Sequence, residues 1–306
     1  MLTVDQDHDS APRAERVGDG EVARTGSVLH GLARAAYDRI DAVNWSKLKL
    51  MLKSPAHYRH NLLQRGGDSD AKRRGRVTHL SVLEPQRFQS DCVVWDGGPR
   101  RGKDWEKFKK AHADVEIVTE AEYETCAALG AAVRSDPTAL AYLSNGKSEV
   151  TVQWRSSEPD SGAVAGWDLA CKGRLDFLAA NAIVDLKTTR AASEHGFAAE
   201  SHRYRYDCQA AYYVDGYEAA TGIRPPYVIV AVEVDAPHVV TVFRVPDEIL
   251  ARGRETYRDC LQRLAFCTRE NVWPAYTDGE VELRLPPWVS QRDDDDISDL
   301  DLVIGE

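Results

Sequence analysis

The chain has 306 residues, 43% of them hydrophobic, which is enough apolar material for the core of one large domain or two small ones. Its formal net charge is −10, but residues 1–28 carry −3 and residues 292–306 carry −6, so the body between them carries only −1. A nearly neutral body does not exclude phosphate binding, because basic side chains can still line one groove.

The sequence also disfavours a membrane-spanning protein and a disulfide-stabilised protein. No segment is apolar over the roughly 18 residues that cross a bilayer, and the N-terminus lacks the apolar core of a signal peptide. The six cysteines are scattered without a C-x-x-C pair, which disfavours disulfides and argues against a zinc or iron–sulfur site. We therefore expect a cytoplasmic protein with buried thiols.

The N-terminal region changes character near Val43. Residues 1–28 are polar and lack a sustained apolar period, which predicts a flexible arm, with ordered structure beginning near Val43. Helical spacing then runs to Lys53, with Asn44 as a candidate N-cap. A second helix is predicted to begin at Pro55.

Two basic stretches flank the next predicted helix. A polar, basic segment over residues 69–76 leads into a helical pattern that ends at Pro85. The Gly-, Lys- and Arg-rich stretch over residues 95–110 predicts a mobile basic loop, and residues 119–134 predict a further helix.

After Gly146 the apolar period becomes strand-like. Three consecutive strands, a helix, a hairpin and a long final helix are expected over residues 148–154, 170–178, 182–188, 204–221, 226–234, 238–245 and 247–268. The fold class is therefore α/β, with a single domain over residues 29–291. The acidic tail over residues 292–306 is predicted to be disordered.

The second and third strands place two acids opposite each other. If Ala180-Asn181 forms a two-residue turn, position i pairs with position 361 − i, and Asp176 faces Asp185. Lys187 lies two residues after Asp185 and so projects from the same strand face. Two adjacent carboxylates normally need a cation between them to stay ionised, and magnesium prefers oxygen ligands.

These three charges could instead form an exposed salt-bridge set on an ordinary hairpin. The flanking residues Ile183, Val184 and Leu186 argue against this alternative, because they make the strand apolar enough to lie inside a sheet, where a charge needs a reason to exist.

Several motifs occur in a fixed order along residues 43–290. They are Asn44-Trp45-Ser46-Lys47-Leu48, Ser54-Pro55-Ala56-His57-Tyr58, Gly75-x-x-x-His79, Leu83-Glu84-Pro85, Gly173-Arg174-x-Asp176, Asp185-x-Lys187-Thr188-Thr189 and Gln209-x-x-x-Tyr213. In these motifs the chain resembles the RecB-like branch of the PD-(D/E)XK nucleases, and within it the RecE-type exonucleases of phages and prophages. The resemblance implies the restriction-endonuclease-like core, a central mixed β-sheet flanked by helices.

The resemblance also implies roles for individual residues. Asp176 and Asp185 would hold Mg²⁺, for which Mn²⁺ could substitute, together with His79, while Lys187 orients water. Glu149 resembles an acid that precedes the catalytic hairpin, and could equally be a solvent-facing strand residue. Gln209 and Tyr213 would order the active site from one helix face. The competing interpretation is that the tyrosines of this helix, Tyr206, Tyr212, Tyr213 and Tyr217, are core aromatics.

By the same resemblance, the substrate would be duplex DNA ends, degraded from 5′ to 3′ to expose single strands for recombination. A ring-shaped homo-oligomer, a single-strand annealing recombinase as partner and a location in the bacterial host cytoplasm are implied as well. Two alternatives stay open: a nuclease module of a helicase–nuclease or CRISPR-adaptation system, and a non-catalytic scaffold that binds DNA ends.

Basic residues near aromatics are the candidates for DNA contacts, because bases and phosphates need both kinds of partner. Solvated surface charge is the competing interpretation. The candidates are Arg73, Arg74, Arg76, Arg100, Arg101, Lys103, Arg203 and Arg205.

Overall fold

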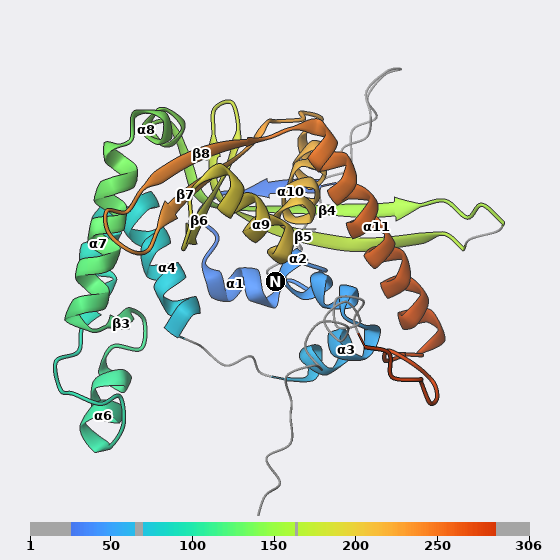
Figure 1. The fold of residues 1–306 in the computed structure, drawn as a ribbon, viewed down its shortest axis with the longest axis horizontal. Coiled ribbons are helices and arrows are strands. Elements are labelled where there is room, and N and C mark those ends of the chain that lie inside the picture. Colours follow the sequence, from blue (N-terminus) through green and yellow to red (C-terminus); the bar gives the residue numbers. More distant parts are fainter. Residues whose placement is uncertain (1–25, 65–69, 163–164, 286–306) are drawn as a thin grey trace, which may run out of the picture.

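The computed structural model describes residues 26–64, 70–162 and 165–285, and is built around a six-stranded mixed sheet with helices on both faces (Figure 1). The strand order is β1-β4-β5-β6-β7-β8, in which β6 and β7 run parallel and the other neighbours are antiparallel. The strands are β1 (Gly26–Leu29), β4 (Gly146–Glu158), β5 (Trp167–Ala179), β6 (Ile183–Thr189), β7 (Tyr227–Glu233) and β8 (Val240–Val245).

The parallel pair lies inside the sheet because its residues are apolar on both faces. In β7, Tyr227 and Ile229 face one core, whereas Val228 and Val230 face the other, and all four are almost completely buried. Strands covered on both faces lose the polar alternation of a half-exposed strand. The expectation of a central mixed sheet flanked by helices is confirmed.

One face of the sheet is covered by helices from both ends of the chain. The long helix α10 contacts β4, β5 and β1, and Gly216 allows this close approach, since a Cβ atom there would lie 2.7 Å from the ring of Trp154. The helices that contribute residues to the core on this side are α2 (Trp45–Leu48), the 3-10 helix η1 (Lys49–Leu52), α3 (Pro55–Leu63), α9 (Glu194–Tyr204), α10 (Tyr206–Thr221) and α11 (Asp247–Glu270). The short helix α1 (Arg34–Arg39) precedes them in the chain.

The other face carries α4 (Asp70–Leu83), α7 (Glu120–Ser135) and α8 (Pro137–Leu143). A small group of elements, here called the annex, lies against α4 and α7. In it, β2 (Cys92–Val94) and β3 (Glu116–Val118) form a parallel pair. Its helices are α5 (Pro85–Ser90) and α6 (Lys103–Ala111). The annex packs on its own cluster of Val77, Phe88, Val118 and Cys126.

The N-cap predicted at Asn44 is confirmed, and α3 and α7 are also capped by side chains at their first turns. Asn44 accepts a hydrogen bond from the Lys47 amide at 3.0 Å, and Ser54 caps α3. At the start of α7, Thr119 and Glu122 each bond the other's backbone amide, which satisfies two donors that the first turn leaves unpaired. Each cap depends only on neighbouring residues, which is why the cap at Asn44 could be predicted from the sequence.

Several expected boundaries are wrong. Residues 26–28, assigned to the flexible arm, belong to β1, and α1 follows it well before Val43. The stretch over residues 95–110 is not a loop throughout, because α6 begins at Lys103, and α4 already begins at Asp70. Helices α8 and α9 are not among the expected elements. Residues 1–25 and the acidic tail over residues 292–306 lie outside the described residues.

All six cysteines are free thiols, and five of them are buried. Among the described residues, no helix combines the length and the hydropathy that a bilayer crossing requires.

Candidate active site

The hairpin of β5 and β6 has the expected register. Phe177 pairs with Val184 and Leu178 with Ile183, so that position i lies opposite position 361 − i. The ladder ends at Phe177 and Val184, just before Asp176 and Asp185. There the amide of Leu186 donates to Oδ2 of Asp176 at 2.9 Å. The carboxylate thus takes the place of a strand carbonyl, and both acids lie where the strands stop pairing.

Asp185 is a charge held inside the protein, with 1% of its surface exposed. Its Oδ1 accepts a hydrogen bond from Nε2 of Gln209 at 2.8 Å, and its Oδ2 forms an ion pair with Nζ of Lys187. Nζ of Lys187 also lies 4.8 Å from the centre of the Tyr206 ring. The expected sharing of one face by Asp185 and Lys187 therefore holds.

Asp176 lies between a histidine and a second carboxylate. His79 points Nδ1 at Oδ1 of Asp176, 3.5 Å away, while its Nε2–H donates to the carbonyl oxygen of Leu186 at 3.2 Å. Burial raises the pKa of Asp176 above its usual range; the charge of His79 opposes the shift, and that of Asp185 adds to it. The site therefore favours a positive charge close to Asp176.

The glycine of the Gly75-x-x-x-His79 motif is not needed for a close approach of α4 to the sheet, because a Cβ atom at Gly75 would meet nothing within 4 Å. His79 reaches Leu186 and Asp176 across the α4–β6 contact without it.

Glu149 lies opposite Asp176 in the β4–β5 register, between the pairs Ser148–Phe177 and Val150–Leu175. It has φ of 53°, a left-handed conformation that costs about 1 kcal/mol for a residue with a Cβ atom. Its carboxylate is ion-paired with Arg174.

Arg174 is a site residue to which the sequence assigned no role, although it stands two residues before Asp176 and such spacing could have suggested one. It binds Glu149, and its Nη1 donates to the carbonyl oxygen of Leu32 at 2.9 Å. The segment between β1 and α1 is thereby connected to the acids of the site.

Helix α10 contributes two further residues beside the acids of the site. Gln209 contacts Asp185 directly, and Tyr213, one turn later, packs on Gly173, where a Cβ atom would lie 2.9 Å from the Tyr213 ring. Burial raises the pKa of Tyr213, and the nearby Tyr37 and Asp176 add to the shift. Tyr212 lies in the core and donates to the carbonyl oxygen of Val43 at 2.7 Å. Tyr213 packs against the same core cluster, as do Tyr206 and Tyr217, so these tyrosines are core aromatics, and Tyr213 in addition lies near Asp176.

The donor chemistry of the site suits a divalent ion. Asp176 and Asp185 offer carboxylate oxygens, and Oδ2 of Asp185 is buried without an aligned hydrogen bond. Nε2 of His79 is used in the bond to the Leu186 carbonyl oxygen, which leaves Nδ1 as the ring atom that faces the acids. Among the described residues, no three such side chains stand close enough together to form a complete metal cluster, and Lys187 and Arg174 neutralise two of the acids.

Half of the candidate DNA-binding residues are paired inside the chain. Arg73 and Arg100 both bind Glu122, which burial alone would make less acidic, but their hydrogen bonds lower its pKa to about 2. Arg76 binds Glu116 at 2.6 Å, and Arg205 binds both oxygens of Asp207 at 3.0 Å. Their guanidinium groups are committed to protein carboxylates, which weakens the DNA-binding interpretation.

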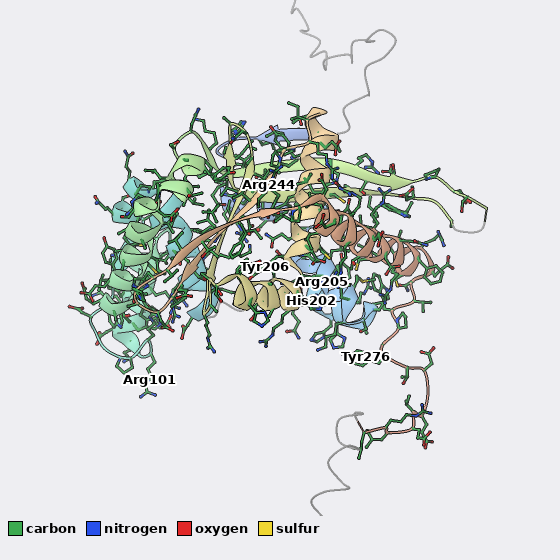
Figure 2. The ribbon with its side chains drawn as sticks, turned by 45° about the horizontal axis from the view of Figure 1, so that its top comes forward. Arg101, His202, Arg205, Tyr206, Arg244 and Tyr276 are labelled. Atoms are coloured by element: carbon green, nitrogen blue, oxygen red, sulfur yellow. The ribbon has the colours of Figure 1, made fainter. Side chains whose placement is uncertain are left out.

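The remaining candidates are Arg74, Arg101, Lys103 and Arg203. Arg101, Lys103 and Arg203 are exposed, and Arg74 is half-buried. Arg101 lies on the annex at one end of the molecule, whereas the junction of α9 and α10 lies near the middle of the view (Figure 2). Arg203 lies beside that junction, with its guanidinium carbon 5.5 Å from the centre of the Tyr204 ring.

Comparison with known proteins places this geometry in a family. Residues 44–284 match the model of a family described as a PDDEXK-like domain of unknown function, DUF3799. No curated protein matches significantly. A crystal structure from Eubacterium rectale, of a protein whose proposed activity is that of an exonuclease, is similar in fold with a TM-score of 0.56 and 16% identity. The match covers 85% of this chain and 98% of that one.

A second structure, named SSO0001, is 15% identical and covers 76% of this chain and 96% of its own, but its TM-score of 0.26 is too low to bear on the fold. The family match spans both strands of the β5–β6 hairpin as well as His79 and Gln209. The chain therefore belongs to the PDDEXK-like family DUF3799, and with it to the PD-(D/E)XK nuclease superfamily.

Proposed function

We propose that the chain is a magnesium-dependent exonuclease that degrades linear duplex DNA from its ends. The observation that carries the proposal is the meeting of Asp176, Asp185 and Lys187 where β5 and β6 stop pairing. Two carboxylates in a buried position are unfavourable without a compensating positive charge. A fold that keeps them together is expected to use them.

The ligands of the ion would be Asp176 and Asp185, with His79 and Glu149 as further candidates. A divalent ion, Mg²⁺ or in its place Mn²⁺, supplies the positive charge that phosphodiester hydrolysis needs at the leaving oxygen. Lys187, oriented by Asp185 and Tyr206, can donate a hydrogen bond to water or to a phosphate oxygen. Gln209 keeps Asp185 in place through the bond to Oδ1.

The finer assignment follows the RecE-type resemblance of the sequence motifs. It comprises 5′-to-3′ polarity, a homo-oligomeric ring, a single-strand annealing recombinase as partner and a role in recombination in the cytoplasm of a bacterial host. Gly173-Arg174-x-Asp176, Asp185-x-Lys187 and Gln209-x-x-x-Tyr213 support it, because their members lie around one site.

The test is digestion of linear and closed-circular duplex DNA with and without Mg²⁺. The parent chain is compared with Asp185→Ala and with Asp168→Ala, a control whose exposed acid pairs with Arg155 at the outer end of β5. We expect loss of linear DNA alone, dependent on the metal and on Asp185. Hydrolysis-resistant linkages at one end then report polarity.

Two other outcomes would replace the proposal. Cutting of the circular DNA would indicate an endonuclease on this fold. Absence of metal-dependent cleavage of either substrate, together with retained DNA binding, would favour a scaffold that binds DNA ends, in which the Lys187–Asp185 and Arg174–Glu149 pairs are permanent.

A further inference from the structure

The junction between α9 and α10 is a sharp turn at a single residue. Arg205 has φ of 59° and ψ of 50°, a left-handed conformation that is unfavourable for a residue with a side chain. Its guanidinium compensates by binding Asp207 in a bidentate manner and Thr256 at 3.0 Å. The turn is therefore fixed, and it sets the directions of the residues on either side.

Those two residues are tyrosines, and the turn stacks their rings. The centres of Tyr204 and Tyr206 are 5.9 Å apart, with 27° between the ring planes. Tyr206 is partly buried and contacts Phe197 at 6.0 Å, which in turn stacks on Phe243 of β8 at 4.7 Å. The aromatic row therefore rests on the sheet and ends at Tyr204, which is 45% exposed.

The row passes directly beside the active site. Nζ of Lys187 lies 4.8 Å from the centre of the Tyr206 ring, and Tyr204 is the next ring outward. At roughly 3.4 Å per nucleotide of a strand, the two steps together span no more than about three nucleotides. A strand whose phosphate lies at Lys187 can therefore bring one of its first bases onto Tyr204.

A single exposed tyrosine needs no explanation, because much protein surface is apolar. Tyr204 differs in three respects. Its ring stacks on the ring of Tyr206, the Tyr206 ring contacts Lys187, and the guanidinium carbon of Arg203 lies 5.5 Å from the centre of the Tyr204 ring. A flat ring in a fixed orientation beside a cation is the combination that binds an unpaired base and its phosphate.

We propose that Tyr204, backed by Tyr206, is a stacking platform for an unpaired base at the end of the DNA, and that Arg203 binds the phosphate of the same nucleotide. The base takes the place of the Arg203 guanidinium on the ring, and the guanidinium turns to the phosphate. The inference rests on the proposed nuclease function and specifies its substrate as an end with at least one unpaired nucleotide.

The experiment measures binding of fluorescent oligonucleotides in EDTA, where metal-dependent cleavage is blocked. Each duplex carries three unpaired nucleotides at its 5′ or its 3′ end, and a base-free sugar replaces the first, second or third of them in turn. Stacking of one base contributes roughly 1–3 kcal/mol. At one position we therefore expect the parent to bind the complete end about tenfold more tightly than the base-free one.

The variants are Tyr204→Ala, Tyr204→Trp and the matched control Tyr276→Ala. Tyr276 is an exposed tyrosine in the C-terminal segment, where it packs on His57 and not on the aromatic row (Figure 2). Tyr204→Ala should abolish the preference for the complete end, whereas Tyr204→Trp and Tyr276→Ala should retain it. Equal binding of both ends by the parent, or an unchanged preference in Tyr204→Ala, would overturn the platform.

A second measurement separates the ring from the cation. Arg203→Ala should reduce the dependence of affinity on salt by about one phosphate contact, a slope change of about 0.7 for single strands, while Tyr204→Ala should leave the slope unchanged. Failure of the parent to bind any oligonucleotide would overturn the platform and the nuclease together. Cleavage of linear DNA without a base preference would overturn the platform alone.

Discussion

Two clusters of charged side chains differ in how their charges are arranged. At the end of the β5–β6 ladder, the buried Asp185 and the half-buried Asp176 lie near each other, and desolvation raises the pKa of Asp176. Arg73 of α4 and Arg100 of the annex converge on Glu122 of α7, and their hydrogen bonds lower its pKa to about 2. The first region leaves like charges close together, whereas the second pairs opposite ones.

This difference distinguishes a functional site from a structural ion-pair cluster, the cluster of Arg73, Arg100 and Glu122. A carboxylate that gains more from its partners than it loses by burial stabilises the fold, whereas one that is kept less acidic than normal costs folding free energy and is retained for another reason. The comparison can be sharpened or broken by removing one group at a time.

Removal of the charge of Asp185 should have the largest effect. Asp185→Asn keeps an oxygen that can accept from Gln209 but loses the charge paired with Lys187. We expect nuclease activity to fall by about 10²–10³-fold, the range for the loss of one group that stabilises charge in a transition state, with the circular dichroism spectrum unchanged. A variant that retains activity would show that the buried acid is structural.

The next largest effect is expected on the stability of the protein when the structural ion-pair cluster around Glu122 is disrupted. Glu122→Gln leaves Arg73 and Arg100 without their shared charge, which should lower the free energy of unfolding by about 2 kcal/mol, less than for a fully buried pair. Urea denaturation measures it. DNA affinity should not change, and a loss of affinity without a loss of stability would contradict the assignment.

The same residue gives a dependence on pH. The folded pKa of Glu122, about 2, lies below its ordinary value of 4.5, so its contribution is complete above about pH 5 and is lost as the pH falls toward 2. Denaturation of the parent should therefore become easier over this range more steeply than that of Glu122→Gln. Parallel curves would show that Glu122 does not stabilise the fold through its charge.

A smaller effect is expected at Gln209, which positions Asp185 without carrying charge. Gln209→Ala removes the 2.8 Å hydrogen bond and should lower kcat about tenfold, as for the loss of a partner that orients a ligand. The matched control is Asp215→Asn, since Asp215 lies on the same helix but pairs with Arg254, away from the site. Equal losses in the two variants would indicate damage to α10 and not to the site.

The smallest effect separates exposed from paired arginines. Arg101→Ala should weaken DNA binding about threefold and reduce its salt dependence if the annex contacts phosphates, whereas Arg76→Ala, which loses the bond to Glu116, should change neither. Fluorescence anisotropy at several salt concentrations measures both. The reverse order would mean that the Arg76–Glu116 pair opens for DNA.

Features decided by neighbouring residues were predictable from the sequence. The turn at Ala180-Asn181 fixes the hairpin register, and the caps of α3 and α7 need only the next few positions. The gathering of Asp176, Asp185 and Lys187 follows from that register and the strand period. Gln209 required the resemblance, because no local rule brings α10 onto β6.

Features decided by distant partners were not predictable. The strand β1 reads as a polar arm because its partner, β4, lies far along the chain, and only pairing gives the segment a structure. Arg73 also binds the nearby Asp70, but Glu122 and Glu116, which bind Arg73, Arg100 and Arg76, are remote in sequence. The basic runs therefore could not be recognised from the sequence as parts of structural ion pairs. The break at Arg205 depends on Thr256 of α11, and α9 was therefore missed.

The position of β1 has a consequence for the order in which the chain acquires its structure. The hairpin of β5 and β6 closes a short loop, whereas Gly26 must find Trp154 and Leu32 must find Arg174. Closing a longer loop costs more entropy. We therefore expect β1, although it is synthesised before the other strands, to pair with the sheet among the last. Protection of its amides from hydrogen exchange during refolding should then appear after that of β6.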